Sequence, residues 1–397
     1  MRQYRPWMLD WLNFLLADVR GALGPYLGVF LVTQIHWSQS EVGVVTMLGG
    51  LLGLAVQTPI GAALDVTRAK RALVVVALAA LAGAALLIFA VSRFWAVAAA
   101  NLVMAVAGDV FGPAVAALTL GLVARAELAR RMGRNSAFDH AGNVVIALLA
   151  GAVGSAVSQR AVFLLVPLMA IAAGVVVLAI PAAAIDHDRA RDDGAAGAAG
   201  HAAGWRVLLE SRALLVFAAS VLLFHLANAA LLPLVGQKLA AAHPDDAAAM
   251  LSACIVAAQL VMLPIALLVG ARADRWGWRK LLAVAFVVLP VRAMLYTLSD
   301  SSTWLIGVQL LDGVAAGIFG ALTPLAVADI MRGSGRFNLA LGAVATAQGI
   351  GASASGMLAG VIVDRFGYGP TFLSLAALAA AAAGLFGGWM PKTRGDG

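Results

Sequence analysis

Two carboxylates, Asp109 and Asp312, stand inside long apolar stretches of this 397-residue sequence. A charge in apolar surroundings is costly, so such a group faces water or a partner, or it holds a proton. Neither residue has a basic neighbour within one helical turn along the chain. We therefore predict that both carry protons or contact a cation. The alternative is that each carboxyl group only packs between helices, bonded to a backbone group or an amide.

Six further polar side chains in the apolar stretches are expected to line a substrate cavity. They are Asp18, Arg20, Asn101, His225, Asn228 and Gln309. His225 and Asn228 are three residues apart and so share one face of a helix, and a histidine can titrate near neutral pH. Each of these residues has a plainer interpretation as a hydrogen-bonded side chain that packs between helices.

The segment around Asp18 and Arg20 combines charge with weak helix-forming chemistry. The two residues are two positions apart, so they point to different sides of a regular helix. Residues that weaken a helix or allow close helix packing follow them: Gly21, Gly24, Pro25 and Gly28. We expect Arg20 to anchor a substrate or to pair with a carboxylate. Arg292 lies toward the end of its apolar stretch, and its guanidinium group is expected to reach out to the membrane surface.

The composition is that of a membrane protein rather than a soluble one. Hydrophobic residues make up 62% of the chain and charged residues only 12%. Apolar runs longer than about 18 residues recur, and each could cross a bilayer as a helix. The single cysteine, Cys254, can form neither an internal disulfide nor a zinc site. The chain contains no nucleotide-binding loop, metal cluster or hydrolytic triad, so an enzyme, an ATP-driven pump and a cofactor are not expected.

We predict an all-α membrane protein with twelve transmembrane helices. Residues 182–212 between the sixth and seventh helices are polar and rich in Ala and Gly, which predicts a linker between domains 1–181 and 213–397. The predicted spans are 9–32, 41–64, 72–92, 95–122, 136–158, 161–181, 213–236, 249–271, 281–298, 303–330, 339–364 and 369–390.

The Lys and Arg residues are distributed unequally between the two sides of these predicted spans. With a cytoplasmic N-terminus, 21 Lys and Arg residues fall in the tails and cytoplasmic loops and 4 on the opposite side. Such a bias sets the orientation of membrane helices. We therefore expect an inner (plasma) membrane protein with both termini cytoplasmic. The net charge of +7 and the pI of about 10.2 reflect this orientation, and no nucleic-acid partner is expected.

Two helix starts can be predicted from capping patterns. Ser38 and Glu41 form a capping box, in which each side chain bonds the backbone amide of the other residue, and this predicts a helix start there. Ser136 and Asp139 have the same spacing, so we interpret Asp139 as part of a helix start rather than of a binding site.

Two loops carry related motifs, one in each half of the chain. The first contains Gly61, Asp65, Lys70 and Arg71, and the second contains Gly270, Asp274, Arg275, Gly277, Arg279 and Lys280. Gly61 and Gly270 are separated by 209 residues, as are Asp65 and Asp274. Both loops resemble the G-x-L-A-D-r-x-G-r-k signature of the major facilitator transporters. The second copy is close, whereas the first has Val66 and Arg68 at two signature positions.

This resemblance implies two six-helix bundles with a central cavity that opens alternately to either side. It also implies that the loop aspartates act as gates: Asp65 would meet the segment from Gly335 to Asn338, and Asp274 the segment from Arg134 to Ser136. Asp109 and Asp312 are counterparts if counted from Arg134 and Arg336, but not if counted from the loop aspartates, so their relation stays open.

We interpret the chain as a proton-coupled secondary transporter that moves a small organic molecule, with export favoured by similarity to exporters. Two signatures of drug antiporters are absent, since Met104 replaces an arginine and the stretch 142–151 lacks a Gly-Pro. One alternative is uptake of a metabolite or organic anion at Arg20 and His225. A remote alternative is a membrane sensor, which the short tail disfavours. The expected partners are the substrate, protons and the lipid bilayer, with the chain as a monomer.

Overall fold

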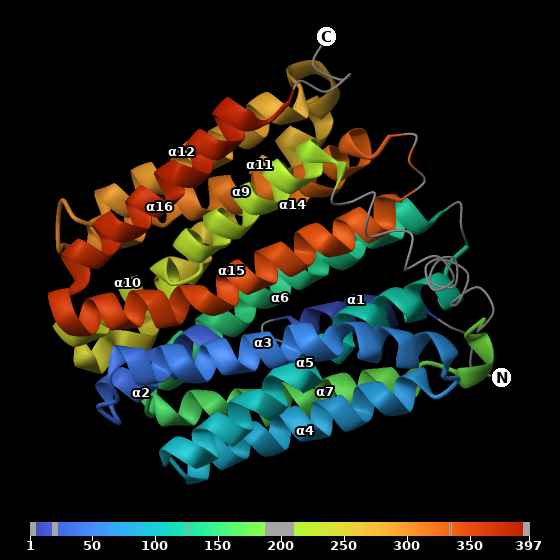
Figure 1. The fold of residues 1–397 in the computed structure, drawn as a ribbon. Coiled ribbons are helices and arrows are strands. Elements are labelled where there is room, and N and C mark those ends of the chain that lie inside the picture. The colour runs from blue at the N-terminus through green and yellow to red at the C-terminus, as the bar shows by residue number, and fades with distance from the viewer. Residues whose placement is uncertain are drawn as a thin grey trace. The chain divides into compact units, whose positions relative to one another are not determined.

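The computed structural model describes residues 5–17, 23–124, 127–186, 210–332, 334 and 336–391, and in these ranges it is built of helices and short connections without strands (Figure 1). Asp18 and Arg20 lie outside the described residues, as do the side chains of Asp65, Asp274 and Asn338.

The described helices overlap the predicted spans, although several of their ends differ by more than four residues. Up to residue 184 they are α1 (Trp7–Leu16), α2 (Gly24–Thr33), α3 (Gln39–Val66), α4 (Lys70–Ala90), α5 (Phe94–Leu122), α6 (Leu128–Ala156), η3 (Arg160–Leu164), α7 (Leu165–Ala179) and η4 (Ala182–Ala184). From residue 212 onward they are α9 (Arg212–Asn228), α10 (Leu231–Ala242), η7 (Pro244–Asp246), α11 (Ala247–Trp276), α12 (Trp278–Leu295), α13 (Ser302–Val308), α14 (Leu310–Ile330), α15 (Phe337–Phe366) and α16 (Tyr368–Trp389).

Ten helices among the described residues are long and apolar enough to cross a membrane. The predicted spans 9–32 and 281–298 are not among these ten. The first is divided between α1 and α2, and α12 carries Arg279, Lys280 and Arg292. The helical class is therefore established, while twelve membrane crossings stay a prediction.

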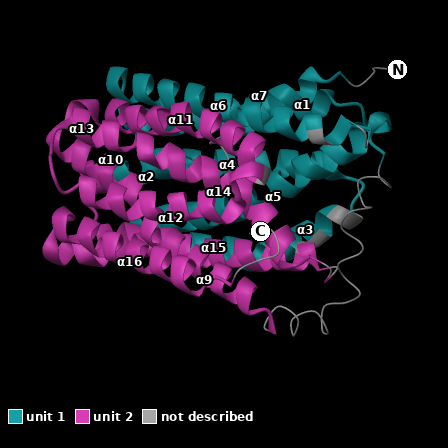
Figure 2. Cartoon of the chain, turned by 90° about the horizontal axis from the view of Figure 1, so that it is seen from above, with its two compact units in different colours: residues 1–30, 48–198 teal, residues 31–47, 199–397 magenta. Residues whose placement is uncertain are grey.

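The chain forms two compact units, residues 1–30 with 48–198 and residues 31–47 with 199–397 (Figure 2). The beginning of α3 thus belongs to the second unit and its remainder to the first. The same helix pairs pack in both units. In the first unit α1 packs on α6 and α7, and α4 on α5 and α7; in the second α9 packs on α15 and α16, and α12 on α14 and α16.

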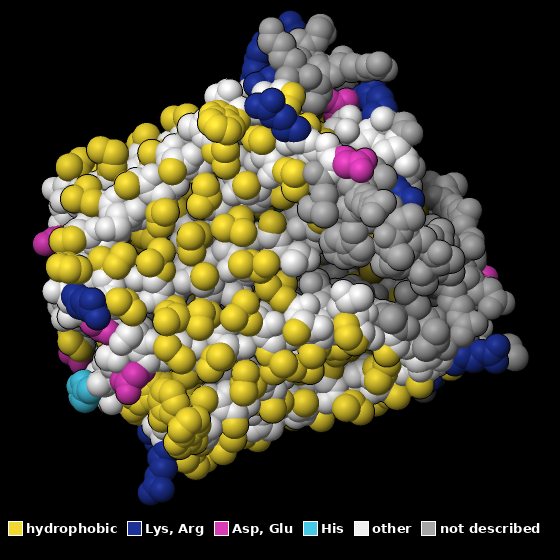
Figure 3. Space-filling model, viewed as in Figure 1, with side chains coloured by type: hydrophobic (Ala, Val, Ile, Leu, Met, Phe, Trp, Pro, Cys, Tyr) yellow, Lys and Arg dark blue, Asp and Glu magenta, His cyan; other side chains and the backbone are white. Residues whose placement is uncertain are grey.

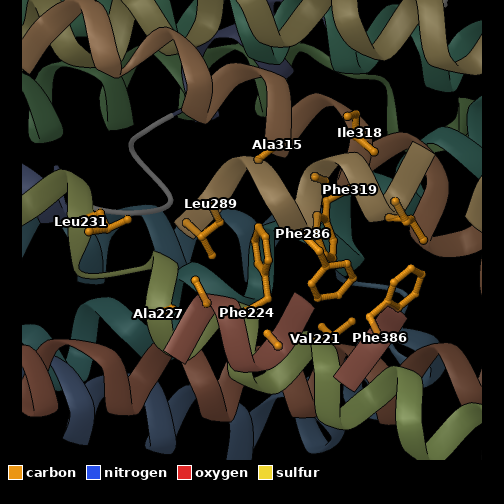
Figure 4. Packing of buried hydrophobic residues seen from close by; sticks show 14 of the residues in the cluster. Val221, Phe224, Ala227, Leu231, Phe286, Leu289, Ala315, Ile318, Phe319 and Phe386 are labelled. Carbon is orange, nitrogen blue, oxygen red and sulfur yellow. The ribbon is translucent and has the colours of Figure 1, made fainter. Parts of the chain in front are cut away.

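Aromatic side chains fill the middle of the second unit. Phe224 stacks obliquely on Phe319 at 4.2 Å between ring centroids, and Phe286 stacks on Phe386 at 4.5 Å (Figure 4). Hydrophobic side chains also dominate the outer face that Figure 3 shows, whereas charged side chains lie near the helix ends. Large apolar residues such as Val76 and Ile171 are more than 60% exposed, as in helices that face lipid.

One of the two predicted helix starts is confirmed and the other is wrong. At the start of α3 the Ser38 amide donates to Glu41 at 2.8 Å, and the Glu41 amide donates to the Ser38 hydroxyl at 3.2 Å. In contrast, α6 begins at Leu128, so Ser136 and Asp139 lie within the helix. The polar residues before Ser136 look like a loop in sequence, yet Ala, Leu, Arg and Met favour a helix there.

Candidate functional site

A cavity of about 410 Å³ lies within the second unit, between α9, α11, α14 and α15. Most of its wall is apolar, with Phe224, Phe319 and Met262 as the largest groups. None of the lining side chains is Asp, Glu, Lys or Arg. A mostly apolar cavity with a few polar groups is the usual form of a small-molecule site.

His225 and Asn228, two predicted cavity residues, lie together on this wall. They occupy the last turn of α9, just before the chain turns at residues 229–230 and continues as α10. Pro233 lies in the first turn of α10 and lacks an amide hydrogen, which explains the interruption. The freed Ala230 amide donates instead to the Ser355 hydroxyl at 2.9 Å.

The polar atoms at this interruption are available to a ligand. The His225 Nδ1 atom lies 3.0 Å from the Val221 carbonyl oxygen, and hydrogen bonding there leaves Nε2 for other contacts. The Asn228 Oδ1 atom is buried and has no hydrogen-bond partner within the described part of the chain. A buried acceptor without a partner is costly, so it marks a place where a bound molecule can donate a hydrogen bond.

Aromatic rings and two more polar groups complete the wall. The rings of His225 and Phe319 meet edge to face, with centroids 5.6 Å apart. Gln348 of α15 and Thr323 of α14 also line the cavity. Thr323 was missed in the sequence, because a threonine in an apolar helix is commonly satisfied by its own backbone and gives no signal of a site.

Asp312 and Gln309 lie in a different cluster. Asp312 forms an ion pair with Arg292 of α12, and Gln309 accepts a hydrogen bond from the Tyr296 hydroxyl. Arg292 is 1% exposed, so the expectation that it reaches the membrane surface is wrong. Gln309 is fully buried at the junction of α13 and α14, and it does not line the cavity. The pair was not visible in the sequence because its members lie on separate helices.

Asn101 and Asp109 face α3 in the first unit. A Cβ atom added to Gly49 would lie 2.3 Å from the Asn101 amide nitrogen, and one added to Gly53 would lie 2.7 Å from an Asp109 carboxylate oxygen. Asp109 is half-buried, and no ion pair of it is seen with the residues that the structure describes. The two glycines of α3 therefore make the room that these polar side chains occupy.

The geometry also resolves the relation between Asp109 and Asp312. Asp109 faces α3, whereas Asp312 faces α12. The counterpart of α12 in the first unit is α4, by the matching helix pairs described above. The two carboxylates therefore have different neighbours and are not structural counterparts.

The first predicted span departs from regular helix geometry at the described residues on either side of 18–22. Ala17 at the end of α1 is extended, and Leu23 before α2 has a positive φ of 56°. Leucine rarely adopts this conformation, so the chain is not a regular helix on either side of residues 18–22. The predicted cavity residues Asp18 and Arg20 fall between these two points, and their roles stay predictions.

The basic residues of the first motif loop bind the ends of helices. Gly61 lies inside α3, and Lys70, the first residue of α4, is buried. The Lys70 ammonium group donates to the Leu64 and Thr67 carbonyl oxygens at the end of α3. Arg71 donates to the Ile180 carbonyl oxygen just beyond α7. A cation at a helix C-terminus satisfies unpaired carbonyl groups and complements the helix dipole.

The second motif loop repeats this contact. Arg279 donates to the Met390 carbonyl oxygen at 2.6 Å, at the end of α16, the last helix of its unit. Gly277 has a φ of 80° and alone separates α11 from α12, which requires glycine. Gly270 lies within α11, and Arg275 and Lys280 are exposed. The predicted gating contacts of Asp65 and Asp274 involve side chains outside the described residues.

A further ion-pair cluster joins α1 and α6. Asp10 is 3% exposed and lies 2.8 Å from an Arg131 nitrogen and 2.7 Å from an Arg134 nitrogen. This cluster was not predicted from the sequence, where Arg134 was expected to lie in the segment that meets Asp274. In the described residues no group of three or more His, Cys, Asp or Glu could hold a metal ion.

Known proteins resemble the chain along nearly its full length. The family model of the Major Facilitator Superfamily matches residues 10–291 and, in a second match, 217–397. An uncharacterised MFS-type transporter of Mycobacterium tuberculosis is 48% identical over 387 residues, which cover 97% of this chain and 93% of that protein. The methyl viologen resistance protein SmvA of Salmonella typhimurium is 25% identical over 136 residues, 34% of this chain and 28% of its own.

Two solved structures share the fold at low sequence identity. A mutant of the nucleoside transporter NupG has a TM-score of 0.82 at 14% identity and covers 97% of this chain and 100% of its own. A bacterial homologue of the human lysosomal transporter Spinster, inward-facing and unoccupied, has a TM-score of 0.78 at 12% identity and covers 97% of each chain. The chain therefore belongs to the Major Facilitator Superfamily of multi-pass membrane transporters and is not an enzyme.

Proposed function

We propose that the protein is a proton-coupled secondary transporter that exports a small organic molecule by alternating access. In this proposal both termini and the linker are cytoplasmic, the chain crosses the inner membrane twelve times, and it works as a monomer. The short match to a methyl viologen resistance protein is consistent with export.

The cavity of the second unit carries the proposal. Its wall combines aromatic rings with the unpartnered Asn228 oxygen and bears no formal carboxylate, ammonium or guanidinium charge. These groups suit a neutral or weakly basic molecule with an apolar body and a hydrogen-bond donor. An organic anion would find no fixed positive charge on this wall, which favours the proposed substrate class over anion uptake.

Asp109 is the preferred proton carrier in this proposal. Burial among apolar groups disfavours a charged carboxylate, whereas a neighbouring cation stabilises it. Asp312 has Arg292 as such a neighbour, so it could take up a proton only if that pair separated. Asp109 lies against Gly53 without a cation among its described neighbours and can change its protonation at lower cost.

The binding step is tested by thermal stability of the purified protein against a panel of small organic molecules. A ligand that binds only the folded state raises its apparent stability. We expect Asn228→Ala to weaken binding of a stabilising compound about tenfold, the loss of roughly one hydrogen bond. Ser374→Ala, on α16 and outside the cavity, should leave binding unchanged.

The coupling step is tested by proton release on addition of that compound, followed by transport in vesicles with a pH gradient of either direction. Asp109→Asn should bind the compound without releasing protons, while Asp312→Asn and Asp18→Asn should still release them. Release by Asp109→Asn at the normal level would contradict its role. Accumulation driven only in the direction of uptake would contradict export.

A further inference from the structure

A third copy of the motif-loop pattern lies near the end of the chain. Gly360, Asp364, Arg365 and Gly367 have the spacing of Gly270, Asp274, Arg275 and Gly277. In both copies an aromatic residue stands on each side of the last glycine. The residues between the first glycine and the aspartate differ between the two copies. The third copy therefore does not match the full family signature.

The third copy also adopts the same backbone geometry. Gly367 has a φ of 82°, close to the 80° of Gly277, and it alone separates α15 from α16 (Figure 1). Between these two joints the chain makes three passes, through α12, through α13 with α14, and through α15. Because three is odd, the two joints lie at opposite ends of the second unit.

The carboxylate of this third copy binds the beginning of α3. The Gln39 amide donates to one Asp364 oxygen at 3.0 Å, and the Ser40 amide donates to the other at 2.8 Å. The Gln39 side-chain amide donates to the Tyr368 hydroxyl at 3.2 Å. All these residues belong to the second unit, although the rest of α3 belongs to the first.

The contact completes the cap of a 28-residue helix. The first amides of a helix have no partner within it. At α3 the Glu41 amide is bonded by the Ser38 hydroxyl, which leaves those of Gln39 and Ser40 to Asp364. A carboxylate is favoured at this position because the amide dipoles point toward it. The cap is therefore assembled from two segments more than 300 residues apart.

Glycines allow the close approach of α3 and α15 beneath this cap. A Cβ atom on Gly360 would lie 2.4 Å from the Gln39 carbonyl oxygen, and one on Gly43 would lie 2.6 Å from the Gly356 carbonyl oxygen. No larger residue fits at either point without moving a helix. Asp364 is itself exposed, so water can replace the amides when the two helices separate.

We propose that Gly360 to Gly367 is a latch that holds the start of α3 against α15 at the end of the second unit opposite the Gly277 joint. The latch is closed in this structure and opens when that end of the transporter opens. The latch would be closed when the predicted gates at Asp65 and Asp274 are open, and open when they are closed. Copies of one motif would then close the transporter on both sides of the membrane. The inference rests on the proposed alternating-access function.

The latch is tested by distance measurements in the full-length protein. Spin labels are placed at Gln34 and Asp245, both exposed in the second unit, on a Cys254→Ser background. Asp364→Asn keeps the shape of the side chain but turns an amide donor toward a backbone donor. We expect Asp364→Asn to raise several-fold the fraction of molecules in which the labels at Gln34 and Asp245 are far apart. Asp246→Asn removes the same charge from η7 and should change nothing.

A second variant separates opening of the latch from general unfolding. Gly360→Val should shift the distances in the same direction through steric separation, while thermal melting shows that the protein remains folded. Unchanged distances in both Asp364→Asn and Gly360→Val would overturn the latch even if transport is normal. If the label distances shift in these variants but the parent protein transports no substrate, the contact between Asp364 and α3 would be supported and the proposed function would be wrong.

Discussion

Arg292 and Asp312 show how this chain accommodates charge within an apolar unit. Arg292 is 1% exposed and the Asp312 side chain 19% exposed, and the two are paired across α12 and α14. Removing water from both groups is costly, and the pairing offsets that cost only while both partners remain. Single substitutions and a paired substitution should therefore behave differently.

We predict that Arg292→Met destabilises the protein by about 3 to 5 kcal/mol, because it leaves a carboxylate without its partner in an apolar setting. The double variant Arg292→Met with Asp312→Leu should regain most of this loss. Thermal melting of the two purified variants and the parent measures both effects. Equal stability of the single and double variants would contradict a buried, mutually dependent pair.

Residue types were easier to predict than residue partners. His225 and Asn228 share a helix face by their spacing, and both lie on one cavity wall. Arg292 was misjudged, because its position near the end of an apolar stretch favours an exposed guanidinium group, while its partner lies on another helix. Spacing along one helix contains no information about which neighbouring helix will face it.

At the scale of helices, one crossing recurs in both units. A Cβ atom on Gly142 of α6 would lie 2.2 Å from the Phe14 carbonyl oxygen of α1, and one on Gly351 of α15 would lie 2.2 Å from the Leu222 carbonyl oxygen of α9. The two glycines are 209 residues apart, the separation of the first glycines of the motif loops. Small residues at helix crossings allow the backbones to approach closely.

Substitution of either glycine should therefore be destabilising. We predict that Gly142→Ala and Gly351→Ala each cost roughly 1 to 3 kcal/mol, because the added methyl group meets backbone that cannot yield. Gly384→Ala on α16 is the matched control, since nothing lies within 4 Å of its added Cβ. That change should be neutral or slightly stabilising, because alanine favours a helix. Equal melting temperatures for all three variants would contradict this account of the crossing.

Most helices could be predicted from the length of the apolar runs in the sequence. The places where a helix is broken could be predicted only in part. The glycines and the proline near residue 24 indicated a weak first helix, and the chain is indeed irregular at Ala17 and Leu23. The early start of α6 was missed, since Arg131 and Arg134 look like loop residues until Asp10 is seen beside them. Such pairings between distant segments appear only in the folded chain.

At the scale of the whole molecule, the basic residues have two roles. Arg71 and Arg279 bind the carbonyl groups at the ends of α7 and α16, so they join the first helix after each motif loop to the last helix of the same unit. The same residues contribute to the 21-to-4 bias of Lys and Arg. One set of side chains can thus help to orient the helices and then hold their ends together.

The orientation itself is tested with reporter fusions. We predict that a reporter in the 182–212 linker is active only as a cytoplasmic reporter, and that one at Pro244 is active only on the other side, because the basic loops stay in the cytoplasm. Paired fusions to an enzyme active in the cytoplasm and to one active outside it give opposite signals for each site. The same signal at both sites would contradict the predicted topology.

The single-residue joints at Gly277 and Gly367 have a mechanical consequence. A joint of one residue leaves little length between the helix ends it connects, so the end of α11 must move with the start of α12, and the end of α15 with the start of α16. A displacement of the end of α15 is therefore expected to move the first turns of α16, which carry the exposed Leu373. The first turns of α16 should therefore move when the start of α3 separates from α15. A fluorophore at Leu373 would report this separation without touching the latch or the cavity.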